Sequence, residues 1–340
     1  MPLPTPEQYL AMIDAAAADR FAYPAVNVTS TQTLNAAIRG FAEAGADGIV
    51  QVTTGGAAYL AGSSADPVLG ARAFAAAAHE LVAAAPVLVA LHTDHVPAEK
   101  AEGFLRPLLA ESAARVRAGG IPLFHSHMFD GSTLPLEDNL RASARWLQDA
   151  REANVVLEVE VGVVGGAEDD VDGTAADPEQ LYTTTGDLLR TAEALGAGER
   201  GRYLLAATFG NTHGAHARGR VRLRPEILRD GQAALARVRP GARFDYVFHG
   251  SSGSAVADLR AAIGYGVVKV NLDTDAQYAF TRALAGHVLD HWDGVLRVDG
   301  GLGDKRAYDP RSWGRKAEAA MAARVAEAAG RLGAAGRSLA

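Results

Sequence analysis

Val87-Leu-Val-Ala-Leu-His-Thr-Asp-His95 is the stretch from which the fold can be predicted. It begins, after Pro86, as a continuous apolar run and ends in two histidines and an aspartate. A run without polar alternation is typical of a strand buried on both faces, as in a parallel sheet covered by helices. Its polar end predicts ionisable groups at the carboxyl end of the strand, where α/β folds place their chemistry. Taken alone, the pattern fits a hydrogen-bonded core histidine beside a helix-capping aspartate equally well.

Eight strand-like runs follow a helix candidate at about residues 7–18. The runs are Tyr23–Val28, Gly48–Thr53, Val87–Leu91, Ile121–Phe124, Val155–Val161, Tyr203–Ala207, Asp245–Phe248 and Val267–Val270. Helix-like segments rich in Ala, Leu, Glu and Arg separate most of them. This alternation predicts an α/β fold of the (β/α)8 TIM-barrel type, with a doubly wound open sheet as the alternative. We expect residues 1–340 to form a single domain, because no stretch has the composition of a linker.

Two segments do not fit the alternation. Residues 162–177 contain four glycines and five acidic residues, which predicts a long surface loop, either a lid or a solvated acidic segment. Beyond Asp309 the apolar residues Met321, Val325, Ala328 and Leu332 recur at helical spacing. They predict a C-terminal helical extension over about residues 309–340 that caps the barrel or docks a second subunit.

Composition excludes several classes of function. The net charge of −7 argues against a nucleic-acid or membrane-surface partner. The chain has no cysteine, so any metal must be held by histidines and carboxylates. The first residues have neither a basic region nor an apolar one, and no apolar run is long enough to span a bilayer. We therefore expect a soluble, cytoplasmic protein.

Histidine follows three of the predicted strands, as His95, His213 and His249. In a barrel the carboxyl ends of the strands converge on one face, where three imidazoles can form an open zinc site. Each of the three alone is more often structural than catalytic, and it is their joint placement that favours a metal. We interpret the neighbouring His125 and His127 as structural.

A glycine- and serine-rich turn, His249-Gly-Ser-Ser-Gly-Ser254, precedes a predicted helix over residues 255–263. Backbone N–H groups in such a turn bind phosphate, and barrels often keep phosphate after their last strands. The next strand carries Lys269, Asn271 and Asp273 at alternate positions, which face one side.

Carboxylates also occur at strand ends. Glu158 and Glu160 share one face of an apolar strand, so they are either linked to a metal or paired with basic groups. Asp130 is a similar candidate, although a turn-capping aspartate fits the local sequence as well. Asn27, at the end of the first strand, could orient a substrate or satisfy its own turn.

Taken as a set, segments spread over the whole chain resemble the class II, zinc-dependent fructose-1,6-bisphosphate aldolases. The segments are Tyr23-Pro-Ala-Val-Asn-Val, Leu91-His-Thr-Asp-His, Ser126-His-Met, Leu157-Glu-Val-Glu-Val-Gly, Ala207-Thr-Phe-Gly-Asn-Thr-His-Gly, Val247-Phe-His-Gly, Val270-Asn-Leu-Asp-Thr-Asp and Tyr308-Asp-Pro-Arg. The resemblance implies a (β/α)8 fold. It also implies reversible cleavage of fructose 1,6-bisphosphate to dihydroxyacetone phosphate and glyceraldehyde 3-phosphate, a step of glycolysis and gluconeogenesis.

The resemblance also implies roles for individual residues. His95, His213 and His249 match the ligands of one catalytic Zn²⁺, which polarises the ketose carbonyl and stabilises the enediolate. Asp94 matches the acid/base at the C4 hydroxyl, and Glu168 matches the base that moves the dihydroxyacetone-phosphate proton. Substrate-binding residues match at Gly214, Gly250, Ser252, Asn271, Asp273 and Thr274, and we expect Asn27 and Thr53 to bind substrate as well.

Further expectations from the resemblance concern partners and ions. Arg311 matches an arginine that reaches a neighbouring subunit's site to hold the second phosphate, which implies a homodimer or homotetramer. Asp130 and Glu160 match ligands of a second, buried metal position. A monovalent cation, Na⁺ or K⁺, is expected near the phosphate. Because alternation places Asp94 and His95 on opposite faces of a strand, one of them should lie where the backbone turns.

Four positions depart from the family pattern, namely Thr53, Ala167, Ser251 and Gly301. None removes a metal ligand or a proton carrier, but they leave open another ketose phosphate, such as tagatose 1,6-bisphosphate, as substrate. Arg311 favours a substrate phosphorylated at both ends. Two further alternatives are a metal-free aldolase that uses Lys269 and a barrel that only binds sugar phosphates.

Overall fold

The computed structural model describes residues 2–340 except 165, 169–170, 174–180, 212–221 and 298. Eight parallel strands close into a barrel in the order β1-β10-β9-β8-β5-β4-β3-β2. Their bounds are Tyr23–Asn27 (β1), Gly48–Thr53 (β2), Val89–Pro97 (β3), Ser126–Asp130 (β4), Val156–Val161 (β5), Tyr203–Ala207 (β8), Tyr246–Phe248 (β9) and Val267–Leu272 (β10). The predicted (β/α)8 barrel is thus confirmed and the open-sheet alternative is wrong, since β1 pairs with both β2 and β10.

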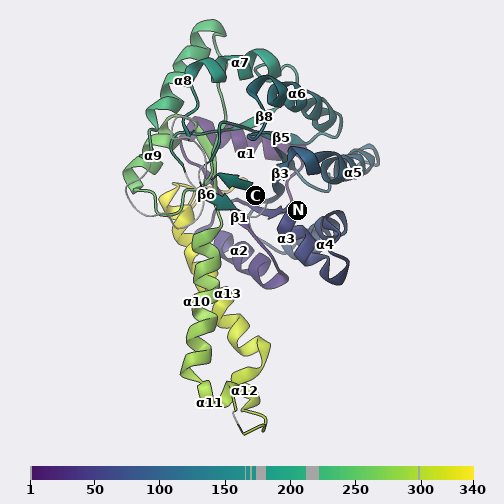
Figure 1. The fold of residues 1–340 in the computed structure, drawn as a ribbon, viewed down its shortest axis with the longest axis vertical. Coiled ribbons are helices and arrows are strands. Elements are labelled where there is room, and N and C mark those ends of the chain that lie inside the picture. Colours follow the sequence, from purple (N-terminus) through teal and green to yellow (C-terminus); the bar gives the residue numbers. More distant parts are fainter. Residues whose placement is uncertain (1, 165, 169–170, 174–180, 212–221, 298) are drawn as a thin grey trace.

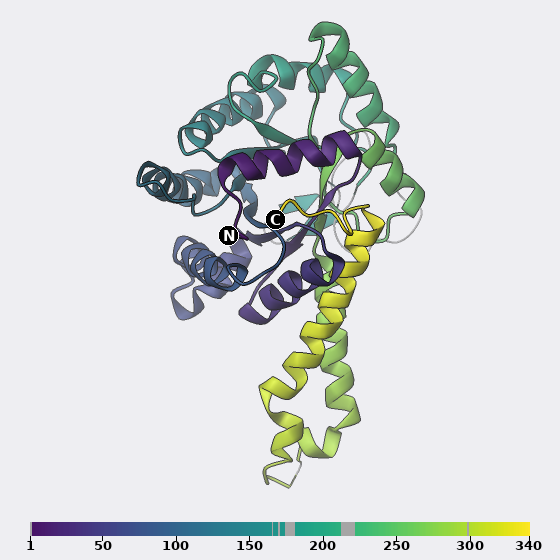
Figure 2. The ribbon, with the colours of Figure 1, turned by 180° about the vertical axis from the view of Figure 1, so that it is seen from behind.

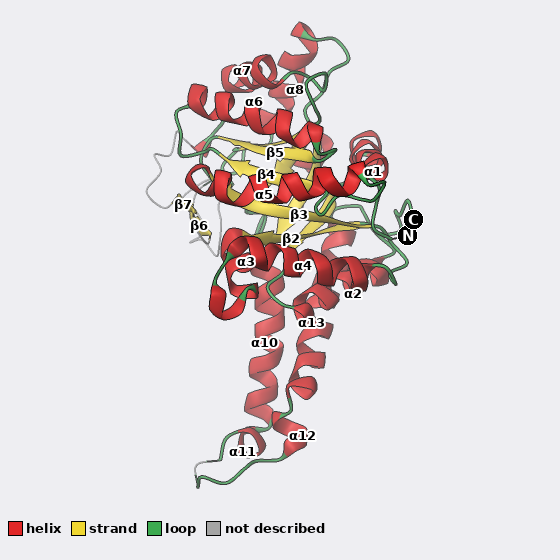
Figure 3. Cartoon of the chain, turned by 90° about the vertical axis from the view of Figure 1, so that its right-hand side faces the viewer, coloured by secondary structure: helices red, strands yellow, loops and turns green. Residues whose placement is uncertain are grey.

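Helices surround the barrel and bury the outer faces of its strands (Figures 1 and 3). They are α2 (Thr31–Ala44), α3 (Thr54–Leu60), α4 (Pro67–Val82), α5 (Ala98–Arg117), α6 (Leu136–Glu152), α7 (Thr185–Leu195), α8 (Glu226–Val238) and α9 (Val256–Gly264), with a short 3₁₀ turn at Gly62–Ser64. Because each strand is covered by helices outside and by side chains inside, its residues are buried along its full length. This explains the continuous apolar runs of the sequence.

The fourth strand differs from its prediction, which placed it at Ile121–Phe124. The observed strand β4 begins at Ser126, and Ser126 pairs with His92 of β3. The polar residues that start β4 are buried because each has a partner: the hydroxyl of Ser126 lies 2.8 Å from His92 Nδ1, and His127 Nδ1 lies 2.7 Å from the hydroxyl of Thr93. Because these polar side chains form hydrogen bonds with the neighbouring strand, β4 does not begin with an apolar run and could not be recognised by one.

The predicted N-terminal helix is present as α1 (Pro6–Asp19), which begins in a capping box formed by Thr5 and Gln8. Figure 2 shows α1 lying across the barrel. Its buried residues Tyr9, Met12 and Ile13 belong to an apolar cluster with residues that line the barrel, including Leu88 and Val268. The helix therefore closes the end of the barrel opposite the carboxyl ends of the strands.

A helical arm leaves the barrel after β10 (Figures 1 and 3). It consists of α10 (Thr274–Asp290), α11 (Trp292–Val295), α12 (Lys305–Tyr308) and α13 (Pro310–Arg331), and α13 returns alongside α10. The predicted C-terminal extension is confirmed, and Met321, Val325, Ala328 and Leu332 are all buried. This apolar stripe is covered within the chain, because α13 packs against α2 and α10.

The segment predicted as a long acidic loop contains a small antiparallel ribbon. Strand β6 (Gly166–Glu168) pairs with β7 (Val171–Gly173). Figure 3 places this ribbon on the side of the barrel toward which the strand arrowheads point. Among the helices in the described ranges, none has the length and apolar character needed to cross a bilayer.

Candidate active site

Asp94 and His95 both reach the site because β3 is irregular at their position. The register of β3 against β4 shifts between Thr93 and Val96, and His95 has a left-handed backbone with φ of 37°. This conformation is uncommon for a residue other than glycine and rotates the side chain out of strict alternation. The predicted turn of the backbone is confirmed, but it lies inside β3, which continues to Pro97, and not at the end of the strand.

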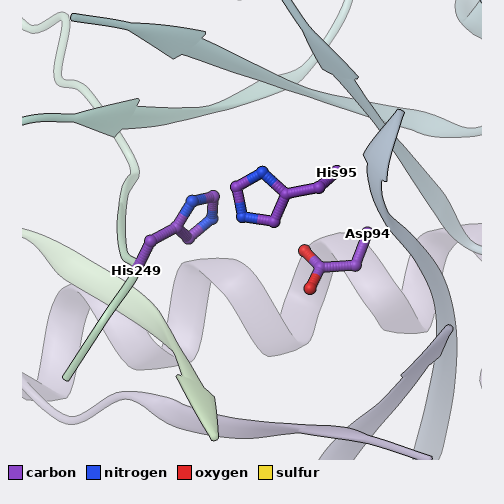
Figure 4. A group of neighbouring side chains, drawn as sticks. All are labelled: Asp94, His95 and His249. Atoms are coloured by element: carbon purple, nitrogen blue, oxygen red, sulfur yellow. The ribbon is translucent and has the colours of Figure 1, made fainter. Parts of the chain in front are cut away.

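His95, His249 and Asp94 point toward one another from β3 and from the turn after β9 (Figure 4). Each of the three offers a ligand atom, and these atoms lie within 4.8 Å of one another. The ring centroids of His95 and His249 are 4.6 Å apart. Imidazole nitrogens and carboxylate oxygens without a thiolate are a donor set that suits a borderline divalent ion. His213, the third predicted ligand, lies outside the described residues.

A second group of donors lies beside the first and contains His95, Asp130 and Glu160. His95 Nδ1 lies 2.9 Å from Asp130 Oδ2, and Glu160 Oε2 lies 3.6 Å from His95 Nδ1 and 3.5 Å from His249 Nδ1. Ser132 also donates its backbone N–H and its hydroxyl to Asp130. Asp130 therefore caps its turn and also contacts His95, and its role as a metal ligand stays a prediction.

Burial, hydrogen bonds and neighbouring charges shift the pKa values of the ionisable groups of this site in different directions. Burial alone would raise the pKa of Asp130, but the hydrogen bonds with His95 and Ser132 outweigh it and lower the pKa. The pKa of Glu160 is raised, first by burial and then by the charge of Asp130. For His249, hydrogen bonds to Glu158 and Glu160 outweigh burial and raise the pKa to about 9. A metal ion bound to His249 would have to displace a proton from the same ring nitrogen.

Three side-chain amides hold the Asp94 carboxylate. Asn271 Nδ2 donates to Oδ1 at 3.1 Å, while Asn27 Nδ2 and Gln51 Nε2 donate to Oδ2 at 3.0 and 2.8 Å. Gln51 Nε2 also donates to Asn27 Oδ1, which orients that amide. The sequence interpretation missed Gln51. The signal available in the sequence was the amide of Gln51 in the middle of the apolar strand Gly48–Thr53. A buried polar group needs a hydrogen-bond partner, so this residue could have been recognised as a candidate for a specific contact.

Lys269 and Glu158 form a buried ion pair, with 2.9 Å between Lys269 Nζ and Glu158 Oε2. Glu158 Oε1 lies 2.8 Å from His249 Nε2. Of the two roles open for Glu158, pairing with a basic group is therefore the one observed. The ammonium group of Lys269 therefore has a buried carboxylate as its partner.

A cavity of about 230 Å³ is lined by three predicted substrate-binding residues, Asn27, Thr53 and Asp273, of which Asn27 is hydrogen-bonded to Asp94. Tyr59 and Gln277 also line it, and the sequence interpretation named neither. On the other side of Asn271, Gly250 has a φ of 62° and opens the turn that contains Ser252. The hydroxyl of Ser251 donates to the carbonyl of Asn271, which ties this turn to β10. Thr274 is the first residue of α10.

Of the remaining predicted site residues, Arg311 lies apart from this cluster, on the helical arm. Arg311 is in the first turn of α13, where its exposed guanidinium pairs with Asp309. Glu168 is in β6, and its side chain lies outside the described part of the structure. Gly214 falls entirely outside the described residues.

The fold and the site together define a (β/α)8-barrel enzyme with a histidine and carboxylate centre at the carboxyl ends of its strands. Residues 7–337 match the family described as Fructose-bisphosphate aldolase class-II. The chain belongs to this family, and the resemblance noted in the sequence is confirmed. Membership implies a divalent metal, and the donor groups around His95 and His249 fit one.

Similar proteins span the whole chain. A fructose-bisphosphate aldolase of Streptomyces galbus is 57% identical over 341 residues, which is 100% of both chains. One of Mycobacterium tuberculosis (strain H37Rv) is 52% identical over 344 residues, covering 100% of this chain and 99% of the relative. The crystal structure of a fructose-bisphosphate aldolase from Campylobacter jejuni superposes with a TM-score of 0.85 at 33% identity, covering 99% and 97% of the two chains.

Proposed function

We propose that this chain catalyses the reversible aldol cleavage of fructose 1,6-bisphosphate to dihydroxyacetone phosphate and glyceraldehyde 3-phosphate. The observation that carries the proposal is the Asp94 carboxylate, held by three amides and facing His95 and His249. Such a group is positioned to exchange a proton with a hydroxyl beside a metal centre. The relatives named above, which match this chain from end to end, carry the name of the same activity.

His95, His249 and, as the proposed third ligand, His213 would hold Zn²⁺. When bound, the metal supplies positive charge that stabilises the negative charge developing on the ketose oxygens. Asp94 takes the proton of the C4 hydroxyl as the C3–C4 bond breaks and the aldehyde leaves. The electron pair of that bond stays on C3, to which Glu168 delivers a proton. In the direction of condensation Asp94 returns its proton to the aldehyde oxygen.

The remaining predicted residues bind substrate in this proposal. Gly214, Gly250, Ser252, Asp273 and Thr274 hold the dihydroxyacetone-phosphate end, with a Na⁺ or K⁺ ion near its phosphate. Asn271 contacts the reacting carbons, and Asn27 and Thr53, which line the cavity, contact substrate as well. Asp130 and Glu160, adjacent to His95, would hold a metal ion in a second, buried position.

Removal of the metal tests the proposal most directly. We expect treatment with EDTA to abolish cleavage of fructose 1,6-bisphosphate in a coupled assay, and added Zn²⁺ to restore it, because the metal held by the histidines supplies the positive charge that stabilises the enediolate. Metal content is measured in the same samples. Full activity in samples shown to contain no metal would contradict the proposal. A ketose 1-phosphate cleaved as fast as the bisphosphate would contradict the substrate assignment.

We further propose that the chain works in the cytoplasm and folds as one domain over residues 1–340. We also propose that it forms a homodimer or homotetramer in which Arg311 binds the second phosphate of the substrate in a neighbouring subunit's site. The 17 residues of α10 carry the arm roughly 25 Å away from the barrel, so Arg311 is remote from its own site. Leu289, Trp292 and Leu302 of the arm are exposed apolar residues that a second subunit could cover.

Mixing two impaired variants tests the role of Arg311. We expect Arg311→Ala to lower kcat/KM for the bisphosphate by at least about tenfold, because a charge-assisted contact to phosphate is lost. Co-expression with Asp94→Asn should restore roughly a quarter of the wild-type activity, since about half of randomly paired dimers then contain one complete site. Each variant carries its own affinity tag, so that mixed oligomers can be purified. Mixed oligomers no more active than the two parents would place Arg311 outside the neighbouring site.

A further inference from the structure

Lys269 is a buried lysine to which the mechanism above gives no task. It is in β10, only 1% of its surface is exposed, and its ammonium has two partners. Nζ lies 2.9 Å from Glu158 Oε2 and donates a hydrogen bond to Asn271 Oδ1 at 2.8 Å. A buried ammonium is costly unless it is paired and hydrogen-bonded, and both conditions are met here.

The contact with Lys269 decides which end of the Asn271 amide faces Asp94. An ammonium group can only donate, so the atom of Asn271 that faces Nζ must be the oxygen. The NH₂ group is then directed to the other side, where it donates to Asp94 Oδ1 at 3.1 Å. Without the lysine, both orientations of this amide are open, and one of them places an oxygen against the carboxylate.

The ion pair with Glu158 holds the ammonium group of Lys269 in its position. His92 Nε2 lies 3.6 Å from Glu158 Oε2, whereas Lys269 Nζ lies 2.9 Å from the same oxygen. The contact with Lys269 is therefore the shorter of the two. His92, Asp94 and Glu158 also lie close enough together to resemble a cation site, and the ammonium lies against this group.

We propose that Lys269 is a positioning residue of the aldol reaction, which acts by orienting Asn271 so that its amide N–H meets the Asp94 carboxylate. The proposal rests on the function proposed above for Asp94. The chain Glu158–Lys269–Asn271–Asp94 runs through side chains of β5, β10 and β3, and each link is a contact of 3.1 Å or less. Lys269 is also linked to His249 through Glu158, so the zinc content of each variant distinguishes an effect on Asp94 from an effect on the metal.

A double-mutant cycle on the full-length, zinc-loaded enzyme tests this route. Lys269→Met should lower kcat by roughly 10- to 100-fold, the loss typical of a catalytic group misplaced by about an ångström, with KM changed less than about threefold. Asn271→Ala should lower kcat as well. Adding Lys269→Met to Asn271→Ala should cost less than about threefold more, because the residue through which the lysine acts is already gone. Zinc content should stay at the wild-type value in all three variants.

Multiplicative losses in the double variant, or a fall in zinc content that accounts for the loss of kcat, would overturn the proposal. Lys316→Met, the same change at an exposed position of α13, is the control and should leave kcat unchanged. If Lys269→Met does not fold because Glu158 has lost its cation, the cycle is repeated in Glu158→Gln, where the same non-additivity is expected. The unaltered chain is assayed first. If it does not cleave fructose 1,6-bisphosphate, the proposed function is wrong. If it is active and the losses in the double variant are multiplicative, the positioning role of Lys269 is wrong.

Discussion

Asp94→Asn is expected to lower kcat for cleavage of fructose 1,6-bisphosphate between about a hundredfold and ten-thousandfold, the contribution typical of general acid–base catalysis. An asparagine cannot take the hydroxyl proton. Its NH₂ group would also face one of the three amides that now donate to Asp94, from Asn27, Gln51 and Asn271. The measurement is the steady-state rate at saturating substrate, with zinc content and circular dichroism recorded for the same preparation.

Asp47→Asn provides a matched control for this variant. Asp47 is as buried as Asp94, but it lies at the opposite end of the barrel, where it accepts hydrogen bonds from Leu88 and from the C-terminal residues Ser338 and Leu339. Asp47→Asn should change stability and leave kcat near its wild-type value. A folded, zinc-containing Asp94→Asn enzyme with wild-type kcat would show that another group carries the proton.

His249→Ala is expected to abolish activity through loss of the metal. Even residues that only orient a metal ligand typically contribute 10- to 100-fold to metal affinity, so removal of a ligand should lower kcat by more than about a thousandfold at ordinary zinc concentrations. The variant also leaves Glu158 without its hydrogen-bond partner at 2.8 Å and Glu160 without the imidazole 3.5 Å away. Bound zinc per chain, measured by atomic emission, should fall together with activity.

His79→Ala is the control for this second prediction. His79 belongs to α4, on the outside of the barrel, and its Nε2 lies 3.1 Å from the carbonyl oxygen of Leu123. Its removal should leave zinc content and kcat close to wild type. If His249→Ala retains one zinc per chain and full activity, the metal is not at the position formed by His95 and His249.

The barrel could be predicted because seven of its strands are apolar runs covered on both faces. The fourth strand could not, because Ser126 and His127 are polar and find their partners only once β3 lies beside them. Regular alternation along a strand would place Asp94 and His95 on opposite faces, so a turn of the backbone near them could be predicted. The left-handed φ of His95 could not be predicted from the sequence. The metal-ligand candidates were identifiable because histidine at a strand end is conspicuous.

Other parts of the site depend on contacts between distant segments. Gln51 appears in the sequence as one polar residue in a strand, and only the folded barrel brings its amide to Asp94. The apolar stripe of α13 was identifiable from its spacing, whereas the pairing of α13 with α10 was not. That pairing is what separates Arg311 from the site of its own chain.

The left-handed His95 within β3 has a consequence for protein design. A non-glycine residue in this conformation costs on the order of 1–3 kcal/mol, which the surrounding barrel must offset. His95 is held by its register shift against β4 and by a hydrogen bond from its backbone N–H to the sulfur of Met128, 3.3 Å away. Transplanting the aspartate and histidine onto a regular strand of another scaffold would send them to opposite faces. The unit to graft is therefore the irregular Thr93–Val96 backbone together with the β4 residues that support it.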